Sequence, residues 1–326
     1  MQTIITCVLA FLVSVVAGRF IIPALRALKV GQTIREIGPT WHNSKQGTPT
    51  MGGVIFMLGC LVCVFTGIPA MRNGDYTHLM IFGFSLIFGV IGFLDDYLKV
   101  KNKRNLGLTE IQKLVLQLAA AALYLVLLRK MGHLTGELYI PFANVSVRIP
   151  WALYLILSVF IIVGTVNAVN ITDGIDGLNT TVTIPVMVFY TVAALLWRRT
   201  GAGLFSAALV GGLAGFLVYN FHPAQVFMGD TGSLFLGGAV CGLAYALDMP
   251  LILILVGIIY IAETMSDIIQ VGYFKLTHGK RIFRMAPLHH HFEKGGWSEN
   301  KIVAVFSSIT VIFCVIAYLG VMNRVM

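Results

Sequence analysis

The sequence LILILVGIIYIA, residues 251–262, is an unbroken apolar run, and LYLVLL at residues 123–128 is a second one. Both are continuously hydrophobic, whereas the strands of a membrane β-barrel alternate between apolar and polar residues. The same character extends over the whole chain, since 57% of its 326 residues are hydrophobic and only 11% are charged. A water-soluble domain is less apolar and carries more charge. The sequence therefore predicts an all-α polytopic membrane protein.

Apolar stretches long enough to cross a bilayer recur along the chain, because a helix needs roughly 20 residues to span the hydrocarbon. We expect about ten such spans, at residues 2–24, 50–68, 78–94, 111–131, 150–166, 182–197, 203–220, 232–248, 251–274 and 302–323. The polar stretches between them are too short for a separate core, so we expect one integral membrane domain over residues 1–326. Residues 135–148 alternate in polarity, which predicts either a short hairpin outside the membrane or an interfacial strip.

The formal net charge of +9 raises nucleic acid as a partner. The placement of the basic residues argues against it, because they concentrate in loops at residues 25–49, 95–110 and 275–301, on one side of the expected topology. By the positive-inside rule this side is cytoplasmic, which puts both termini outside. We therefore expect a lipid bilayer and no nucleic acid as partners, with the basic loops attracting a phosphorylated substrate.

Acidic residues are scarce and gather near the expected inner ends of spans. An aspartate at the bilayer centre costs on the order of 3 kcal/mol, so this gathering indicates a hydrated, functional cavity at the cytoplasmic face. In GFLDDYLK, residues 92–99, Asp95 and Asp96 are adjacent. Their repulsion is relieved by a divalent cation or by protonation of one carboxyl group. The alternative is a charged helix end paired with Lys99 and Lys101.

The segment NAVNITDGIDGLNT, residues 167–180, is the strongest internal signal. Amide and carboxylate side chains recur at every third position, which keeps them near one face of a helix end or a 3₁₀ turn. These residues are Asn167, Asn170, Asp173, Asp176 and Asn179. Gly174 and Gly177 let the backbone approach a ligand closely. The alternative is a solvated loop.

The segment FMGDTGS, residues 227–233, places Asp230 where a helix is expected to begin. Free N–H groups at such a helix end favour anions, so Asp230 is equally well a helix cap or a metal ligand that faces a phosphate. Phe227 offers a flat apolar surface on which a base can stack.

Two loops on the same side add candidate phosphate-binding residues. KQGTPTMGG, residues 45–53, places Lys45 and Thr50 just before a span, as a phosphate site or as an ordinary polar turn. APLHHHFE, residues 286–293, carries three consecutive histidines, whose donors and partial positive charge suit a phosphate or a sugar. An ordinary cytoplasmic loop is again the alternative.

The ninth expected span carries polar residues on one helical face. Glu263, Asp267 and Gln270 share that face, so we expect it to look into the protein or the site.

In chain order, PTMGG, DDYLK, NAVNITDGIDGLN, FMGDTGS and APLHHHFE resemble the motifs of the polyprenyl-phosphate N-acetylhexosamine 1-phosphate transferases. The resemblance covers essentially the whole chain, without a clear departure at the motif positions. APLHHHFE is similar to the branch that transfers phospho-N-acetylmuramoyl-pentapeptide from its UDP-linked donor to undecaprenyl phosphate, forming lipid I and UMP in peptidoglycan biosynthesis. The resemblance also implies Mg²⁺ as cofactor, the bacterial inner membrane as location, a homodimer, and nucleoside inhibitors that compete at the uridine site.

The resemblance further implies roles for individual residues. Asp230 would be a Mg²⁺ ligand, and the residues implied in catalysis are Asp95, Asp96, Asp230 and His289. Asp176 would reach the uracil that stacks on Phe227. The residues implied in substrate binding are Lys45, Thr50, Lys113, Asn167, Asn170, Asp173, Gly174, Asp176, Asn220, Phe227, Gln270, His290 and His291.

Such a reaction requires the repulsion between two phosphates to be neutralised. We expect the lipid phosphate to attack the donor directly, with Asp95 deprotonating or positioning it; a covalent aspartyl intermediate remains the alternative.

A related transferase that uses UDP-N-acetylglucosamine is a rival function, against which the HHHFE segment argues. A cation-coupled transporter is a rival of another class. It predicts acids at midspan positions on several helices, whereas the motif acids gather at the inner ends.

Overall fold

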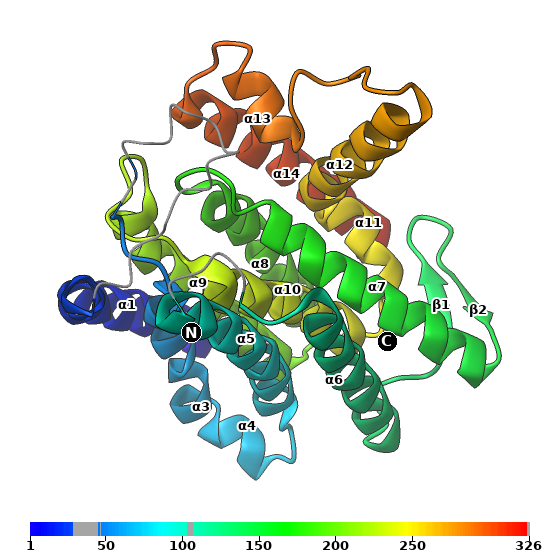
Figure 1. The fold of residues 1–326 in the computed structure, drawn as a ribbon. Coiled ribbons are helices and arrows are strands. Elements are labelled where there is room, and N and C mark those ends of the chain that lie inside the picture. The colour runs from blue at the N-terminus through cyan, green and yellow to red at the C-terminus, as the bar shows by residue number, and fades with distance from the viewer. Residues whose placement is uncertain (29–44, 46, 103–106, 325–326) are drawn as a thin grey trace.

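The computed structural model describes residues 1–28, 45, 47–102 and 107–324, so parts of the predicted basic loops lie outside the described residues (Figure 1). The described helices are α1 (Gln2–Ala27), α2 (Gly53–Cys60), α3 (Val62–Thr66), α4 (Ile68–Arg72), α5 (Thr77–Asn102), α6 (Glu110–Lys130), α7 (Trp151–Ile171), α8 (Leu178–Leu196), α9 (Thr200–Asn220), α10 (Gly229–Ala246), the 3₁₀ helix η2 (Pro250–Ile252), α11 (Leu253–Val256), α12 (Ile258–Leu276), α13 (Leu288–Glu293) and α14 (Glu299–Val321). Strands β1 (Glu137–Ile140) and β2 (Val145–Arg148) form the sheet found in the described part of the chain.

By length and composition, seven of the described helices can cross a membrane, namely α1, α5, α6, α7, α8, α9 and α14. An eighth span results if Pro250–Val256 and Ile258–Leu276, which meet at a bend of 80°, are counted together. The expectation of an all-α polytopic membrane protein is therefore confirmed, whereas the count of about ten spans is not.

Two of the expected spans differ from long apolar helices for local reasons. The segment expected at residues 50–68 is divided into α2, α3 and α4. Helix α4 has Gly67 as its N-cap and Pro69 in its first turn, where proline favours a helix start. The helix expected at residues 232–248 is α10, which is rich in glycine and is not among the candidate spans.

Helix α10 lies at the centre of the bundle, where it packs on α5, α7, α8 and α2 (Figure 1). Its glycines allow this close packing. A Cβ atom built on Gly237 would lie 2.6 Å from the Cα atom of Val166 in α7, and one on Gly238 would lie 3.0 Å from the Cα atom of Ser85 in α5. Because its whole circumference is covered by protein, α10 does not need the apolar surface of a lipid-facing helix.

Helix α1 joins the bundle through a stripe of residues at every fourth position, most of which are small. Thr6, Ala10, Ser14, Gly18 and Ile22 form its buried stripe. On the facing side of α9, a Cβ atom on Gly211 would lie 1.9 Å from the carbonyl oxygen of Cys7. Such contacts between small residues let helix backbones approach closely, which is how helices associate in membranes.

The outer faces of the bundle carry large apolar side chains. Phe20 in α1 is 73% exposed and Phe160 in α7 is 75% exposed. Apolar surface of this kind on several helices fits contact with lipid tails.

The N-terminus and the C-terminal end of the described chain lie at the same end of the bundle. The side chain of Gln2 donates to the carbonyl oxygen of Thr66, and the guanidinium of Arg324 donates to the carbonyl oxygen of Leu247 at the end of α10. The β1–β2 hairpin lies near this end and pairs Glu137 with Arg148, so the predicted hairpin is confirmed.

Candidate active site

The motif residues lie at the opposite end of the bundle from the chain termini. Helices α5, α7 and α9 end there, and α6, α8, α10 and α14 begin there. Hydrogen bonds join these ends, for example from Asn170 of α7 to Asp230 of α10 and from Lys113 of α6 to Asp230. Residues separated by more than a hundred positions in sequence thus form one site.

Asp95, Asp96 and Asp230 form a cluster that we call the carboxylate triad. One oxygen atom from each lies within 4.8 Å of the others, and Asp95 and Asp96 are only 3% and 4% exposed. Thr231 fixes Asp96, because its backbone N–H and its hydroxyl donate to Oδ2 at 2.9 and 2.7 Å. A third carboxylate, that of Asp230 in α10, therefore lies beside the two adjacent aspartates predicted from the sequence.

Two lysines offset part of the negative charge of the carboxylate triad. Nζ of Lys99 lies 2.5 Å from Asp95 and 3.0 Å from Asp230, and Nζ of Lys113 lies 2.9 Å from Asp230. Burial opposes ionisation of Asp230, but a hydrogen bond with Asp95 and the charges of Lys113 and Lys99 outweigh it and lower the pKa of Asp230 well below its usual value. Both sequence interpretations of Asp95 hold in part, since the lysine partner and the acidic cluster are both present.

Amide side chains of α7 support the carboxylate triad. Nδ2 of Asn170 donates to Oδ1 of Asp230 at 2.8 Å and to Ser233 at 2.7 Å. One turn earlier, Asn167 donates to Gln117 of α6 at 2.8 Å. The three-residue spacing thus places one asparagine on Asp230 and the other on the neighbouring helix.

The triad also depends on close backbone contacts. Gly52 N–H donates to the carbonyl oxygen of Phe227, and Phe227 N–H donates to that of Pro49, both at 2.8 Å. Gly229 adopts φ +67°, and a Cβ atom there would lie 2.6 Å from the Thr50 hydroxyl and from Asp96 Oδ2. The PTMGG and FMGDTGS motifs therefore form one paired structure beside the triad, with half-buried Phe227 within it.

Asn220 holds the loop that leads to this structure. Its Nδ2 donates to the carbonyl oxygen of Val226 at 3.0 Å, and its Oδ1 accepts from Thr180 at 2.7 Å. Asn220 is 2% exposed, so in this structure it supports the loop from the interior.

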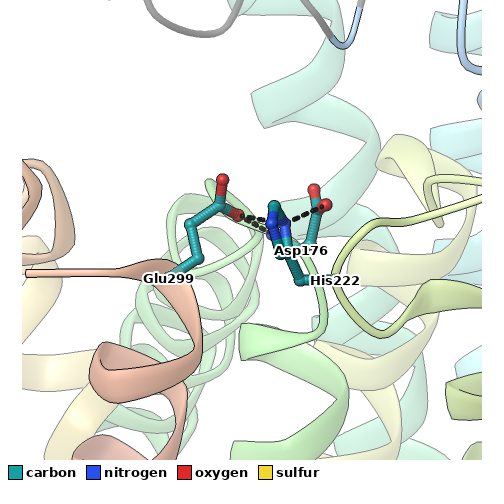
Figure 2. Close-up of side chains that lie close together, drawn as sticks. All are labelled: Asp176, His222 and Glu299. Atoms are coloured by element: carbon teal, nitrogen blue, oxygen red, sulfur yellow. Dashed lines mark hydrogen bonds and ion pairs between the residues drawn. The ribbon is translucent and has the colours of Figure 1, made fainter.

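A second acidic group, which we call the histidine cluster, consists of Asp176, His222 and Glu299 (Figure 2). His222 Nδ1 lies 3.0 Å from Asp176 Oδ2, and the backbone N–H of Asp176 donates to Glu299 Oε2 at 3.0 Å. Lys45 bridges the two acids at 2.8 and 2.7 Å. The cluster therefore joins the loop after α7, the loop after α9 and the first turn of α14.

Asp176 is well supplied with hydrogen-bond donors. Its burial opposes ionisation, but hydrogen bonds from Lys45, from the backbone N–H of Ala224 and from His222 together lower the pKa of Asp176. Both of its carboxylate oxygens already accept bonds from this chain. A direct contact with a nucleobase would replace or share one of these partners.

Asp173 lies between the two groups of acids. Desolvation and the charges of Asp230, Asp96 and Asp176 raise the pKa of Asp173 well above its usual value. Three carboxylates therefore act on Asp173 in addition to its burial. A cationic or hydrogen-bonding ligand at this position would relieve the repulsion.

The three consecutive histidines have separate environments within α13. His289 is 1% exposed and lies 3.0 Å from Glu263 of α12. His290 lies 2.6 Å from Glu293, and His291 Nδ1 accepts from the backbone N–H of Arg284 at 3.1 Å. The three side chains therefore contact different partners.

Gln270 braces the basic loop after α12. Its Oε1 accepts from the N–H groups of Ile282 and Phe283, and its Nε2 donates to the carbonyl oxygen of Phe283. Its amide is thus occupied by the loop, and a role in substrate binding stays a prediction.

The sequence predicts no site role for Lys99, His222 or Glu299, and for Glu263 it predicts only a helical face that looks into the protein or the site. The sequence indicates Lys99 only as an ion-pair partner of the nearby aspartates, Asp95 and Asp96. For Glu299 the signal was an acid at the first turn of an apolar helix next to a basic loop. His222 lacked such a signal, because its partner Asp176 is distant in sequence.

Comparison with known proteins places this fold and site in a class. Residues 78–248 match the family model of glycosyl transferase family 4, and residues 45–57, which include Lys45 and Thr50, match phospho-N-acetylmuramoyl-pentapeptide-transferase signature 1. The class is thus a family 4 glycosyl transferase, and the candidate site lies at one end of its helical bundle.

Similar proteins narrow the class. A protein named phospho-N-acetylmuramoyl-pentapeptide-transferase from Clostridium acetobutylicum is 47% identical over 97% of this chain and 98% of its own. Proteins with the same name from Carboxydothermus hydrogenoformans and Caldanaerobacter subterraneus are each 48% identical, over 95% and 97% of this chain and 96% and 98% of their own. The chain belongs to the phospho-N-acetylmuramoyl-pentapeptide-transferase family, which confirms the resemblance of its motifs.

Proposed function

We propose that this chain transfers phospho-N-acetylmuramoyl-pentapeptide from its UDP-linked donor to undecaprenyl phosphate, forming lipid I and UMP in peptidoglycan biosynthesis. The observation that carries the proposal is the carboxylate triad, which gathers three carboxylates and two lysines at one end of a membrane-type bundle. Family membership supplies the substrates, and the site supplies suitable chemistry.

The triad fits a divalent cation. Hard cations such as Mg²⁺ prefer carboxylate oxygen ligands, and one oxygen from each triad member lies within 4.8 Å of the others. The lysine amines that contact Asp230 support the proposal of a cation at this position. We assign Asp230 as the ligand of Mg²⁺, with Asp95 and Asp96 beside it. When bound, the ion would polarise the phosphoryl oxygens of the donor and offset the charge of the leaving UMP.

We assign the donor's nucleotide to the region between the triad and the histidine cluster. Phe227 supplies a surface for the uracil, and Asp176, Asp173 and Gly174 border the same region. Lys45 and Lys113 carry positive charge toward the two ends of a pyrophosphate. We assign Thr50, which lies beside Gly229, to donor binding. We assign Asn167, Asn170 and Asn220 to support of the phosphates and the metal, through the side chains and backbone that they contact.

In the reaction we favour direct attack by the lipid phosphate on the donor phosphorus that carries the sugar. Asp95 is the group that deprotonates or positions the attacking phosphate, because it lies beside Asp230 at the end of α5. Lys99 and Lys113 offset the charge as the bond to UMP breaks. His289, His290 and His291 are assigned to the phosphate or sugar side of the donor.

The orientation in the membrane follows the charge of the loops. We propose about ten crossings, if α2–α4, α10 and the bent pair each complete one, in the bacterial inner membrane with both termini outside and the site cytoplasmic. We further propose a homodimer, and inhibition by nucleosides that compete with the donor's uridine.

Exchange of labelled UMP into the UDP-linked donor tests the proposal. We expect purified protein to catalyse this exchange only with both Mg²⁺ and undecaprenyl phosphate present. Exchange without the lipid, together with a trapped phosphorylated aspartate, would overturn direct attack. Net transfer from UDP-N-acetylglucosamine at a rate equal to that from the muramoyl-pentapeptide donor would overturn the assigned substrate.

A further inference from the structure

Glu263 of α12 is a fully buried acid whose partner is His289. Its side chain is 0% exposed and that of His289 is 1% exposed. The Glu263 carboxylate accepts from the backbone N–H of His289 at 3.2 and 3.4 Å, and its Oε2 lies 3.0 Å from His289 Nδ1. A single carboxylate thus holds both the backbone and the ring of the first histidine in α13.

This arrangement decides which ring nitrogen is free. An ionised carboxylate only accepts hydrogen bonds, so Nδ1 must carry the proton that points at Glu263. The same pairing of a carboxylate with a histidine fixes the tautomer of catalytic and metal-binding imidazoles in other proteins. The other nitrogen, Nε2, is left to act elsewhere.

The free nitrogen faces the candidate donor site. A Cβ atom built on Gly174 would lie 2.0 Å from His289 Nε2, so the ring rests against the glycine that follows Asp173. Nε2 is buried and lacks a hydrogen-bond partner within the described ranges. A buried nitrogen of this kind is costly unless a partner arrives in the working state.

We propose that Glu263 is a positioning residue of the transfer reaction: it holds His289 with Nδ1 protonated, so that the lone pair of Nε2 accepts a hydrogen bond from a sugar hydroxyl of the donor beside Gly174. The inference rests on the proposed function, because the donor supplies the missing partner. Glu263 itself does not touch the substrate.

The tautomer of the unmodified protein is the first test. The ¹⁵N spectrum of histidine-labelled full-length protein in lipid bilayers should show His289 protonated at Nδ1, with the signal assigned by its loss in H289Q. A neutral ring protonated at Nε2 with bare Nδ1 would overturn the proposal. This measurement does not depend on turnover, so it stands even if UMP exchange by the wild type fails.

Kinetics with E263Q are the second test. Glutamine keeps the size of the side chain but loses its charge, so we expect kcat to fall about tenfold to a hundredfold, with the KM for the UDP-linked donor changed by less than about twofold. The control is T264V on the same helix, a near-isosteric change at a buried hydroxyl that lacks a partner in the described structure, and it should keep kcat. An unchanged kcat in folded E263Q, or equal losses in E263Q and T264V, would overturn the proposal.

Discussion

The carboxylate triad and the histidine cluster both combine acids with lysine, but they are held in different ways. In the triad, Lys99 and Lys113 supply the positive charge, and Asp230 takes both amines on one oxygen. In the histidine cluster, backbone N–H groups of Asp176 and Ala224 are donors beside Lys45. Flexible amines can give way to a metal ion, whereas backbone donors are fixed by the fold. The difference fits the proposal that the triad takes part in the chemistry and that the histidine cluster places the ligand.

Replacement of Asp230 should have the largest effect. D230N removes one negative charge beside Lys99 and Lys113. We expect kcat to fall about a hundredfold to a thousandfold, which is the range seen when an enzyme loses one preorganised electrostatic group. Mg²⁺-dependent release of UMP measures it. D248N is the control, since Asp248 is a buried aspartate at the other end of α10 and should leave turnover intact. An active D230N enzyme would remove the metal assignment.

A change in backbone spacing should damage the triad next. A Cβ atom on Gly92 would lie 2.0 Å from the carbonyl oxygen of Asp230, so G92A must push α5 away from α10. We expect the free energy of unfolding to fall by about 1–3 kcal/mol. We also expect kcat to fall by a larger factor than the factor by which KM changes. G83A lies in the same helix with open space around its Cβ position and should alter neither thermal stability nor turnover appreciably. Equal behaviour of the two variants would contradict the role of close helix approach.

The histidine cluster should respond through substrate affinity. E299Q keeps an acceptor for the Asp176 N–H but removes the charge that pairs with Lys45. We expect the donor KM to rise about tenfold, which corresponds to about 1.4 kcal/mol of binding, with kcat nearly unchanged. E110Q, an exposed glutamate in the first turn of α6, is the control. A fall in kcat without a change in KM would place Glu299 with the chemistry instead.

The smallest effect concerns stability and pH. The pKa of Asp176 is lowered in the folded protein, so its ionised form binds partners there that the unfolded chain lacks. The resulting stabilisation is complete above the unfolded value of about 3.9 and is lost as the pH falls from there through the folded pKa. Thermal unfolding of wild type and D176N should therefore differ by a constant amount from pH 7 to about pH 4 and converge below that. Convergence already at pH 6 would show that the carboxylate is not stabilised in its ionised form.

The sequence anticipated the parts of the site that are local. Asp95 and Asp96 are adjacent, the asparagines of α7 recur at helical spacing, and Asp230 lies in the first turn of a helix. Chain-distant partners escaped prediction, because the pairing of His222 and Glu299 with Asp176 depends on how α8, α9 and α14 pack. Hydropathy likewise identified apolar segments, but it does not register the breaks at Gly67 or the 80° bend before α12.

The enclosure of α10 has a consequence for how the protein responds to its surroundings. Other helices surround α10 on every side. A thicker or thinner bilayer would therefore act on the peripheral helices, such as α1 and α7, and would not contact the helix that carries Asp230. The reactive end can therefore keep its alignment while the rim of the molecule adapts to different lipids.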